Sequence, residues 1–471
     1  MFQHDEQQWA SQTFASCRLR DRRHRRRLIE IGACLARRPA ASLSAACGDD
    51  DAARLGGYRL IENDRVDAEA IAEGGFAATV DASRDAVRLL AASDTTTLTY
   101  SHEVAKTLGD VGGPADRGAR GWLVHSSLLI DATSQIAIGL IDQQWRVRDW
   151  KGRGRKHQRK SRPYPEKESF KWQVTSAHMA ERLGAQMAQV IELCDAEADI
   201  YEYLAYKISH NQRFVVRIAQ DRRVFTSGCL SDEDEKLWAH LEQQPSLGTR
   251  TVTIPQRSGR AAREATLTLR SATVTLRPPQ RAGGVQTAPL VRLTLQAVLV
   301  EEMNPPKDVE PLRWRLYTSE PAQTLQQAQQ TADDYSQRWQ VEEFHKAWKS
   351  GCKVEDQRQQ TAENLRRMAQ IRAFVAVRLL QLKQHAASAP ERPCEPLLDA
   401  TTWKCLWLSV EKKSLPEVPP TQRWALHAVA RMGGWNDSKR TGRPGWVALM
   451  RGWQELQARV AGYRLALAGP L

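Results

Sequence analysis

The 471-residue sequence lacks the features that would place it in a membrane or give it a zinc or nucleotide site. No stretch approaches the roughly 18 consecutive apolar residues that a transmembrane helix requires. The first residues are polar and acidic rather than basic and then apolar, so we expect no secretory signal. The eight cysteines are scattered without a Cys-x-x-Cys pair, which argues against a structural zinc site and a disulfide framework. No Gly-x-x-x-x-Gly-Lys-Ser/Thr loop is present to bind a nucleotide triphosphate. We therefore expect a protein of the reducing cytosol.

Positive charge is what the sequence holds in excess. Lysines and arginines number 68 against 55 aspartates and glutamates, which gives a formal net charge of +13. The densest cluster is residues 21–27, Asp-Arg-Arg-His-Arg-Arg-Arg, where Asp21 can cap a helix that continues through apolar residues 28–36. A second basic segment, residues 151–162, contains glycines and is predicted to be a loop. Both segments suit DNA phosphates, although a solvated basic surface has the same composition.

Hydrophobic periodicity predicts helical ends around a mixed centre. Residues 1–67 have helical spacing, and the tryptophan-rich residues from about 400 onward are helical again. Between them, a Thr-rich strand carrying Asp94 precedes strand-like runs at 122–130 and 136–141.

Two further segments complete the centre. A helical stretch at about 170–187 leads into apolar residues 190–194, a buried strand that ends at Asp195. Residues from about 220 to 318 have almost wholly β patterning. The predicted domains are 1–67, helical; 68–385, an α/β domain with an antiparallel β insertion at about 220–318; and 386–471, helical.

One segment, residues 335–349, organises the rest of the prediction. It contains no glycine or proline, and its apolar residues recur at helical spacing. At about 100° per residue, one face of the helix carries a single carboxylate among cations and a phenol. The residues of this face are Tyr335, Arg338, Glu342, Lys346 and Lys349. Val341, Phe344 and Trp348 fall on the opposite side and would anchor it in a core. The face suits a nuclease site; an exposed amphipathic helix is the alternative.

Three acids stand out by their context: Asp94 on a strand, Asp195 at the end of another and Glu342 on the helix. Carboxylates bind Mg²⁺ and Mn²⁺, and two such ions about 3.5–4 Å apart serve phosphoryl transfer. Without metal, three carboxylates brought together would repel one another. Spacing alone does not bring them together, and Asp195 could instead cap a helix, so the residues by themselves leave this site a hypothesis.

Several motifs in a fixed order resemble a known family. They are Asp94-Thr95-Thr96, Cys-Asp-Ala-Glu-Ala-Asp at 194–199, Tyr-x₂-Arg-x₃-Glu-x₆-Lys at 335–349, Arg120-Gly121-Trp122 and Asp-Ser-Lys-Arg-Thr-Gly at 437–442. This set resembles the DDE transposases of the insertion-sequence-four family over nearly the whole chain. The resemblance implies an α/β fold with an RNase H-like catalytic core, an inserted antiparallel β subdomain, and flanking helical N- and C-terminal domains. It also implies that Asp94, Asp195 and Glu342 are the catalytic triad and hold two Mg²⁺ or Mn²⁺ ions.

The resemblance further implies which residues contact DNA. These are Tyr335, Arg338, Lys346, Lys349, Arg217, Trp314, Arg358, Asn364 and Arg27. Among them, Trp314 matches a tryptophan that stacks on a base flipped out of the transposon end.

The implied activity is cut-and-paste transposition of double-stranded DNA. Transposon ends are nicked, closed as hairpins, reopened, and joined through their 3′-hydroxyls to target DNA. The implied partners are the inverted repeats of the transposon ends, target DNA and a second copy of the chain in a homodimer. The implied location is the bacterial cytoplasm, at the nucleoid when DNA is bound. Two alternatives stay open: a related nuclease without strand transfer, and a domesticated, non-catalytic DNA-binding protein.

Overall fold

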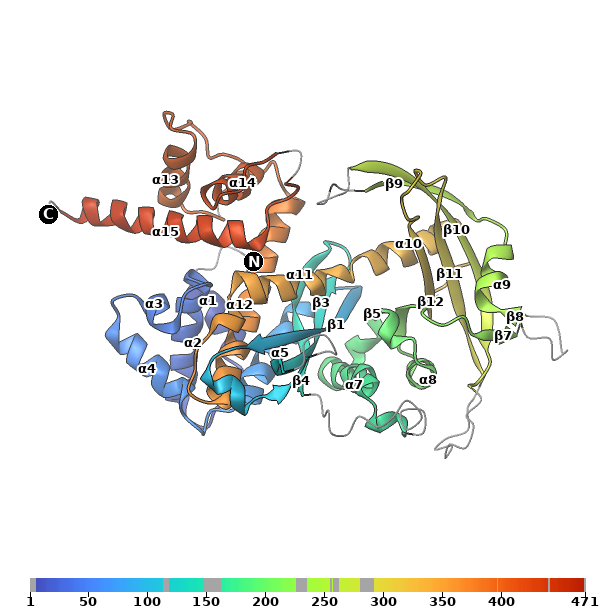
Figure 1. Cartoon of the computed structure of the whole chain (residues 1–471). Coiled ribbons are helices and arrows are strands. Elements are labelled where there is room, and N and C mark those ends of the chain that lie inside the picture. Colours follow the sequence, from blue (N-terminus) through green and yellow to red (C-terminus); the bar gives the residue numbers. More distant parts are fainter. Residues whose placement is uncertain are drawn as a thin grey trace.

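The computed structural model describes the chain apart from residues 1–5, 113–117, 148–161, 226–234, 255, 257–261, 280–291, 396, 439–440 and 470–471. The basic segment predicted at 151–162 therefore lies outside the described residues, except for residue 162. Helices gather at the two ends of the chain, and a long sheet runs through its middle (Figure 1).

The described segment before the first strand is helical, as predicted. Its helices are α1 Glu6–Phe14, α2 Arg22–Arg37, α3 Leu43–Cys47, α4 Asp51–Ile61 and α5 Ala68–Ser83. The predicted cap is confirmed, because the Asp21 side chain accepts a hydrogen bond from the backbone N–H of Arg23 at 2.8 Å. Leu28, Ile31 and Leu35 lie on one side of α2 and are buried, so the arginines of its first turns face outward.

The described strands all belong to one sheet. They are β1 Leu89–Tyr100, β2 Gly109–Asp110, β3 Arg120–Asp131, β4 Ile136–Arg146, β5 Val190–Cys194, β6 Arg213–Arg217, β7 Arg223–Phe225, β8 Glu235–Lys236, β9 Gly248–Ile254, β10 Arg263–Leu276, β11 Leu293–Met303 and β12 Arg313–Thr318. Their order is β2-β3-β1-β5-β6-β12-β11-β10-β7-β8, with β4 paired to β3 and β9 paired to β10. β1, β5 and β6 are mutually parallel, and the other pairings are antiparallel. The apolar β5 is buried along its whole length, as a parallel strand between two covered faces should be.

The predicted antiparallel β region continues the central sheet, because β12 pairs with β6 at its edge. The expectation of almost wholly β structure there is wrong at one element, the helix α9 Leu237–Gln243. Leu237 and Leu241 are four residues apart and both are fully buried. That spacing places both leucines on one side of a helix. The alternation of apolar and polar residues on either side nevertheless led to a prediction of strands.

The long helix α12 Ala362–Ser388 ties the N-terminal helices to the sheet (Figure 1). Arg372 on α12 is fully buried and donates hydrogen bonds to the carbonyl oxygens of Pro39, Ala41 and Cys352 at 2.6–2.8 Å. Three helices follow: α13 Ala400–Val410, α14 Gln422–Met432 and α15 Trp446–Ala468. Across the described ranges, no helix has the length and apolar character needed to span a bilayer.

The helix predicted over residues 335–349 is interrupted at both ends. The first piece, α10, covers Leu325–Ser336, and the second, α11, covers Trp339–Lys346; a π turn follows at Ala347–Gly351. In the step from α10 to α11, the Arg338 N–H bonds to the Tyr335 carbonyl three residues back, which tightens the backbone. In the π turn, the Cys352 N–H bonds to the Ala347 carbonyl five residues back, which widens it.

These two irregularities change the rotation between successive side chains, so the segment is not one regular helix, and Lys349 in the π turn lies at Glu355. The apolar side of the prediction is confirmed, because Val341, Phe344 and Trp348 are fully buried.

Candidate active site

Three separate elements bring the predicted acids to one place. Asp94 lies in the middle of β1, and Asp195 directly follows β5, the parallel neighbour of β1. Glu342 lies on α11, which packs against β1 and β3 (Figure 1). The Asp195 carboxylate also accepts the backbone N–H of Glu197 at 2.8 Å, so the helix-capping role considered from the sequence is present as well.

The electrostatics show that the acids share one environment. Burial, together with the nearby carboxylates of Asp195 and Glu342, raises the pKa of Asp94 to about 6. Burial also raises the pKa of Asp195. Both carboxylates are costly to ionise, mainly because they are buried, and a cation bound beside them would lower that cost.

Arg338 is the cation that lies among these acids. Its guanidinium bonds to the Glu342 carboxylate at 2.5 Å, and its charge lowers the pKa values of Asp94 and Asp195. Among the residues with described positions, no three His, Cys, Asp or Glu side chains are placed to hold a metal ion together. The donor chemistry nevertheless fits Mg²⁺ or Mn²⁺, which take carboxylate oxygens and water. The three acids are thus near one another, with Glu342 turned to Arg338.

Asp94→Asn is expected to stabilise the metal-free protein near neutral pH. The folded Asp94 carboxyl, with a pKa of about 6, holds its proton more tightly than an unfolded aspartate at 3.8. The stabilisation from protonation is therefore fully present below about pH 3.8 and is lost as the pH rises through about 6. At pH 7 the variant should be more stable by about 2–3 kcal/mol. Thermal unfolding in EDTA between pH 4 and 8 measures this, and equal midpoints at pH 7 would contradict it.

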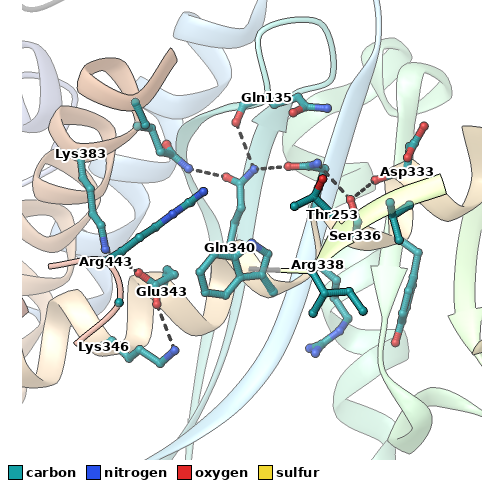
Figure 2. A pocket seen from close by; sticks show the side chains of 18 of the residues that line it. Gln135, Thr253, Asp333, Ser336, Arg338, Gln340, Glu343, Lys346, Lys383 and Arg443 are labelled. Atoms are coloured by element: carbon teal, nitrogen blue, oxygen red, sulfur yellow. Dashed lines mark hydrogen bonds and ion pairs between the residues drawn. The ribbon is translucent and has the colours of Figure 1, made fainter. Parts of the chain in front are cut away.

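A groove of about 1270 Å³ reaches the site through Arg338, which lines it and bonds to Glu342, while the three acids themselves are not among its lining residues. It lies between α11, the strands of the β insertion, α12 and residues 441–447. Five of the residues predicted to contact DNA line it: Arg217, Trp314, Tyr335, Arg338 and Lys346. Figure 2 shows Gln340 at its centre, donating to the Gln135 carbonyl, with Glu343 between Lys346 and Lys383.

Aromatic rings form part of the groove wall. Trp314 is half-buried and meets the buried Tyr335 ring edge to face, with centroids 5.3 Å apart. Trp339 is 42% exposed, and the Lys346 ammonium lies over its ring at 5.4 Å. Trp339 was missed by the sequence interpretation, although an aromatic directly after Arg338 was a visible signal.

Other predicted DNA contacts are occupied within the chain. Lys349 faces Glu355 at 3.7 Å and is not part of the groove lining. Asn364 is buried and accepts a hydrogen bond from Arg367, and Arg27 pairs with Glu30 at 2.7 Å. Arg358 is exposed.

Two buried groups beside the acids had no sequence signal. The Lys171 ammonium, 4% exposed, lies 3.0 Å from Glu197 and lowers the pKa of Asp195. The His345 ring lies 4.0 Å from Asp94, and burial lowers the pKa of His345 to about 3, so the ring is neutral. Neither could be found without knowing which strands and helices meet.

Comparison with known proteins gives two family matches. A model described as "Transposase DDE domain" matches residues 142–378, about half of the chain. This range contains Asp195 and Glu342 but not Asp94. A model described as "Transposase DNA-binding" matches residues 6–66, the segment of α1 to α4.

Among solved structures, the chain is similar to a cryo-EM structure of the piggyBac transposase synaptic complex with hairpin DNA. The identity is 11% over 97% of this chain and 78% of that chain, with a TM-score of 0.36. A superposition this loose does not establish a shared arrangement.

Proposed function

The chain belongs to the family of transposases with a DDE domain, and from this premise we propose that it is a cut-and-paste DNA transposase of the insertion-sequence-four family. Within that family it is similar to the transposase of transposon Tn-five. The single observation that carries the proposal is the convergence of Asp94, Asp195 and Glu342 beside a groove rich in cations and aromatics. A DNA-binding segment over residues 6–66 accompanies that site in the same chain.

The catalytic domain is RNase H-like in this proposal. The support is the order β4-β3-β1-β5-β6, in which β3 alone runs antiparallel to the other four strands. Asp94 on β1 and Asp195 after β5 lie on adjacent parallel strands, where an α/β sheet presents its chemistry.

The reaction is phosphoryl transfer without a covalent enzyme intermediate. Asp94, Asp195 and Glu342 would hold two Mg²⁺ or Mn²⁺ ions, and such ions would supply activation of the attacking oxygen and stabilisation of the leaving one. Arg338 leaves Glu342 for a DNA phosphate, and Lys346 and Arg217 add positive charge along the groove. Trp314 stacks on a base flipped from the transposon end during hairpin formation.

The working unit is a homodimer in which each subunit cleaves the end held by its partner's N-terminal region. The support is α15, whose C-terminal end extends beyond the other helices (Figure 1). Tyr463, Leu465 and Leu467 on it are 49%, 71% and 68% exposed. The protein acts at the bacterial nucleoid.

The test uses the DNA that flanks the gene. Purified protein is incubated with Mg²⁺, a target plasmid and fragments that end in any inverted repeats found there. Nicked, hairpin and target-joined products are then separated on denaturing gels. All three products are expected. Cleavage without joining would favour the nuclease alternative, and binding without cleavage would favour the domesticated DNA-binding protein.

A further inference from the structure

His345 is a buried side chain that the proposed mechanism does not use. It lies on α11 three residues after Glu342, on the side of the helix that faces β1. Its Nδ1 atom is 4.0 Å from the Asp94 Oδ2 atom. Only 6% of the residue is exposed, and its Nε2 atom is buried without a hydrogen-bond partner. Nδ1 is thus the ring nitrogen that can serve Asp94, while Nε2 is the one left without a partner.

The other two acids already have a donor that orients them. Asp195 accepts the Glu197 N–H, and Glu342 is held by Arg338. Asp94 has the backbone N–H of Thr95 as a donor, and the side chain that could add a second donor is His345. A second buried histidine braces the same strand, because His125 on β3 contacts the Thr95 hydroxyl at 2.9 Å.

We propose that His345 is a positioning residue, whose Nδ1–H donates a hydrogen bond to the Asp94 carboxylate and fixes its orientation toward bound divalent cations. The inference rests on the proposed function, since it assumes that Asp94 is a metal ligand. A movement of about 1 Å by the Asp94 carboxylate closes the present 4.0 Å separation to hydrogen-bond distance. Carboxylates that bind metals are themselves held by hydrogen bonds of this kind.

A neutral donor suits this position better than a cation. A lysine or arginine against Asp94 would neutralise the charge that attracts the metal, as Arg338 does at Glu342. The imidazole N–H orients the carboxylate and leaves its negative charge available. The competing explanation is that the ring only fills the core, where it packs beside Phe344 with centroids 5.3 Å apart.

Two substitutions distinguish a His345 ring that orients the Asp94 carboxylate from one that only fills space in the core. His345→Phe keeps an aromatic ring of similar size but removes the donor. His345→Asn loses ring volume but returns an N–H near the position of Nδ1. If the ring orients Asp94, His345→Phe weakens Mn²⁺ binding by about 10–100-fold, and His345→Asn binds Mn²⁺ more tightly than His345→Phe does. If the ring only fills space, Phe is the milder change of the two.

Mn²⁺ binding to the full-length protein is measured by electron paramagnetic resonance of the free ion, alongside thermal unfolding in EDTA to check the fold. His427→Phe is the matched control, because His427 contacts Trp435 on the C-terminal helices, away from the acids. It should bind Mn²⁺ like the wild type. In an Asp94→Asn background, His345→Phe should have no further effect, since the carboxylate it orients is gone.

The outcomes separate this inference from the proposed function. Mn²⁺ binding that depends on Asp94 but is unchanged in His345→Phe overturns the positioning role alone. Wild-type protein that binds no Mn²⁺, with Asp94→Asn indistinguishable from it, overturns the proposed metal site and this inference with it. If His345→Phe does not fold, failure of folded His345→Asn to retain more binding than His345→Leu overturns the role.

Discussion

Replacing either Asp94 or Glu342 with alanine is expected to abolish DNA cleavage while leaving binding to the transposon ends close to the wild-type level. Cleavage needs carboxylates to hold the metal ions, and neither alanine supplies an oxygen ligand. End binding depends mainly on cations and on the segment matched by the DNA-binding model, residues 6–66, which both variants keep. Both variants should therefore lose DNA cleavage and keep binding to the transposon ends.

The measurement pairs a gel-shift assay with a cleavage assay on the same labelled transposon-end DNA. Glu181→Ala, which removes an exposed acid on α7 Lys171–Leu183, is the control and should cleave normally. Glu343→Gln is included because Glu343 adjoins Glu342 but pairs with Lys346 and Lys383 instead. If cleavage survives Glu342→Ala but fails in Glu343→Gln, the third acid of the site is Glu343 and not Glu342.

A second large effect is expected from Lys207→Met, which should destabilise the fold by about 3–5 kcal/mol. Lys207 on α8 Tyr201–Ser209 and Glu192 on β5 form an ion pair at 2.9 Å, and both side chains are fully buried. Removing the lysine leaves the Glu192 charge buried, with the Ser176 hydroxyl as its remaining side-chain donor. Since Glu192 lies three residues before Asp195, the damage should reach the site.

The double variant Lys207→Met with Glu192→Leu tests whether the unpaired Glu192 charge causes the loss of stability in Lys207→Met. Removing both charges leaves no uncompensated ion, so much of the lost stability should return. Midpoints of thermal unfolding, compared among the wild type, both single variants and the double variant, measure the coupling. A double variant that is no more stable than Lys207→Met would show that lost packing, rather than a stranded charge, causes the effect.

The elements of this protein were largely predictable because their signals are local. Asp21 caps α2 because an aspartate before a helix satisfies a free backbone N–H, whatever the rest of the chain does. The Thr-rich strand of Asp94 and the apolar strand ending at Asp195 have the predicted positions for the same reason. The helix α9 was missed because its single buried pair was too short a pattern to outweigh the neighbouring alternation.

The two breaks in the helical segment around Glu342 could not be predicted, because a helical wheel assumes constant rotation. Lys346 pairs with Glu343 within the regular turns of α11, whereas Lys349 lies in the π turn that follows and faces Glu355. The first irregularity lies where α10 and α11 pack against different parts of the sheet, and neither glycine nor proline marks it.

The sequence by itself determined the identity of the acids, the basic N-terminal helix and the resemblance to DDE transposases, since each depends on residue types in a fixed order. Only the tertiary structure decided that Asp94 and Asp195 are neighbours, because the pairing of β1 with β5 joins segments about a hundred residues apart. It also decided that Arg338 lies among the acids and that His345 faces Asp94. The physical reason is that electrostatic interactions and hydrogen bonds depend on distance in space, which packing sets and local sequence does not.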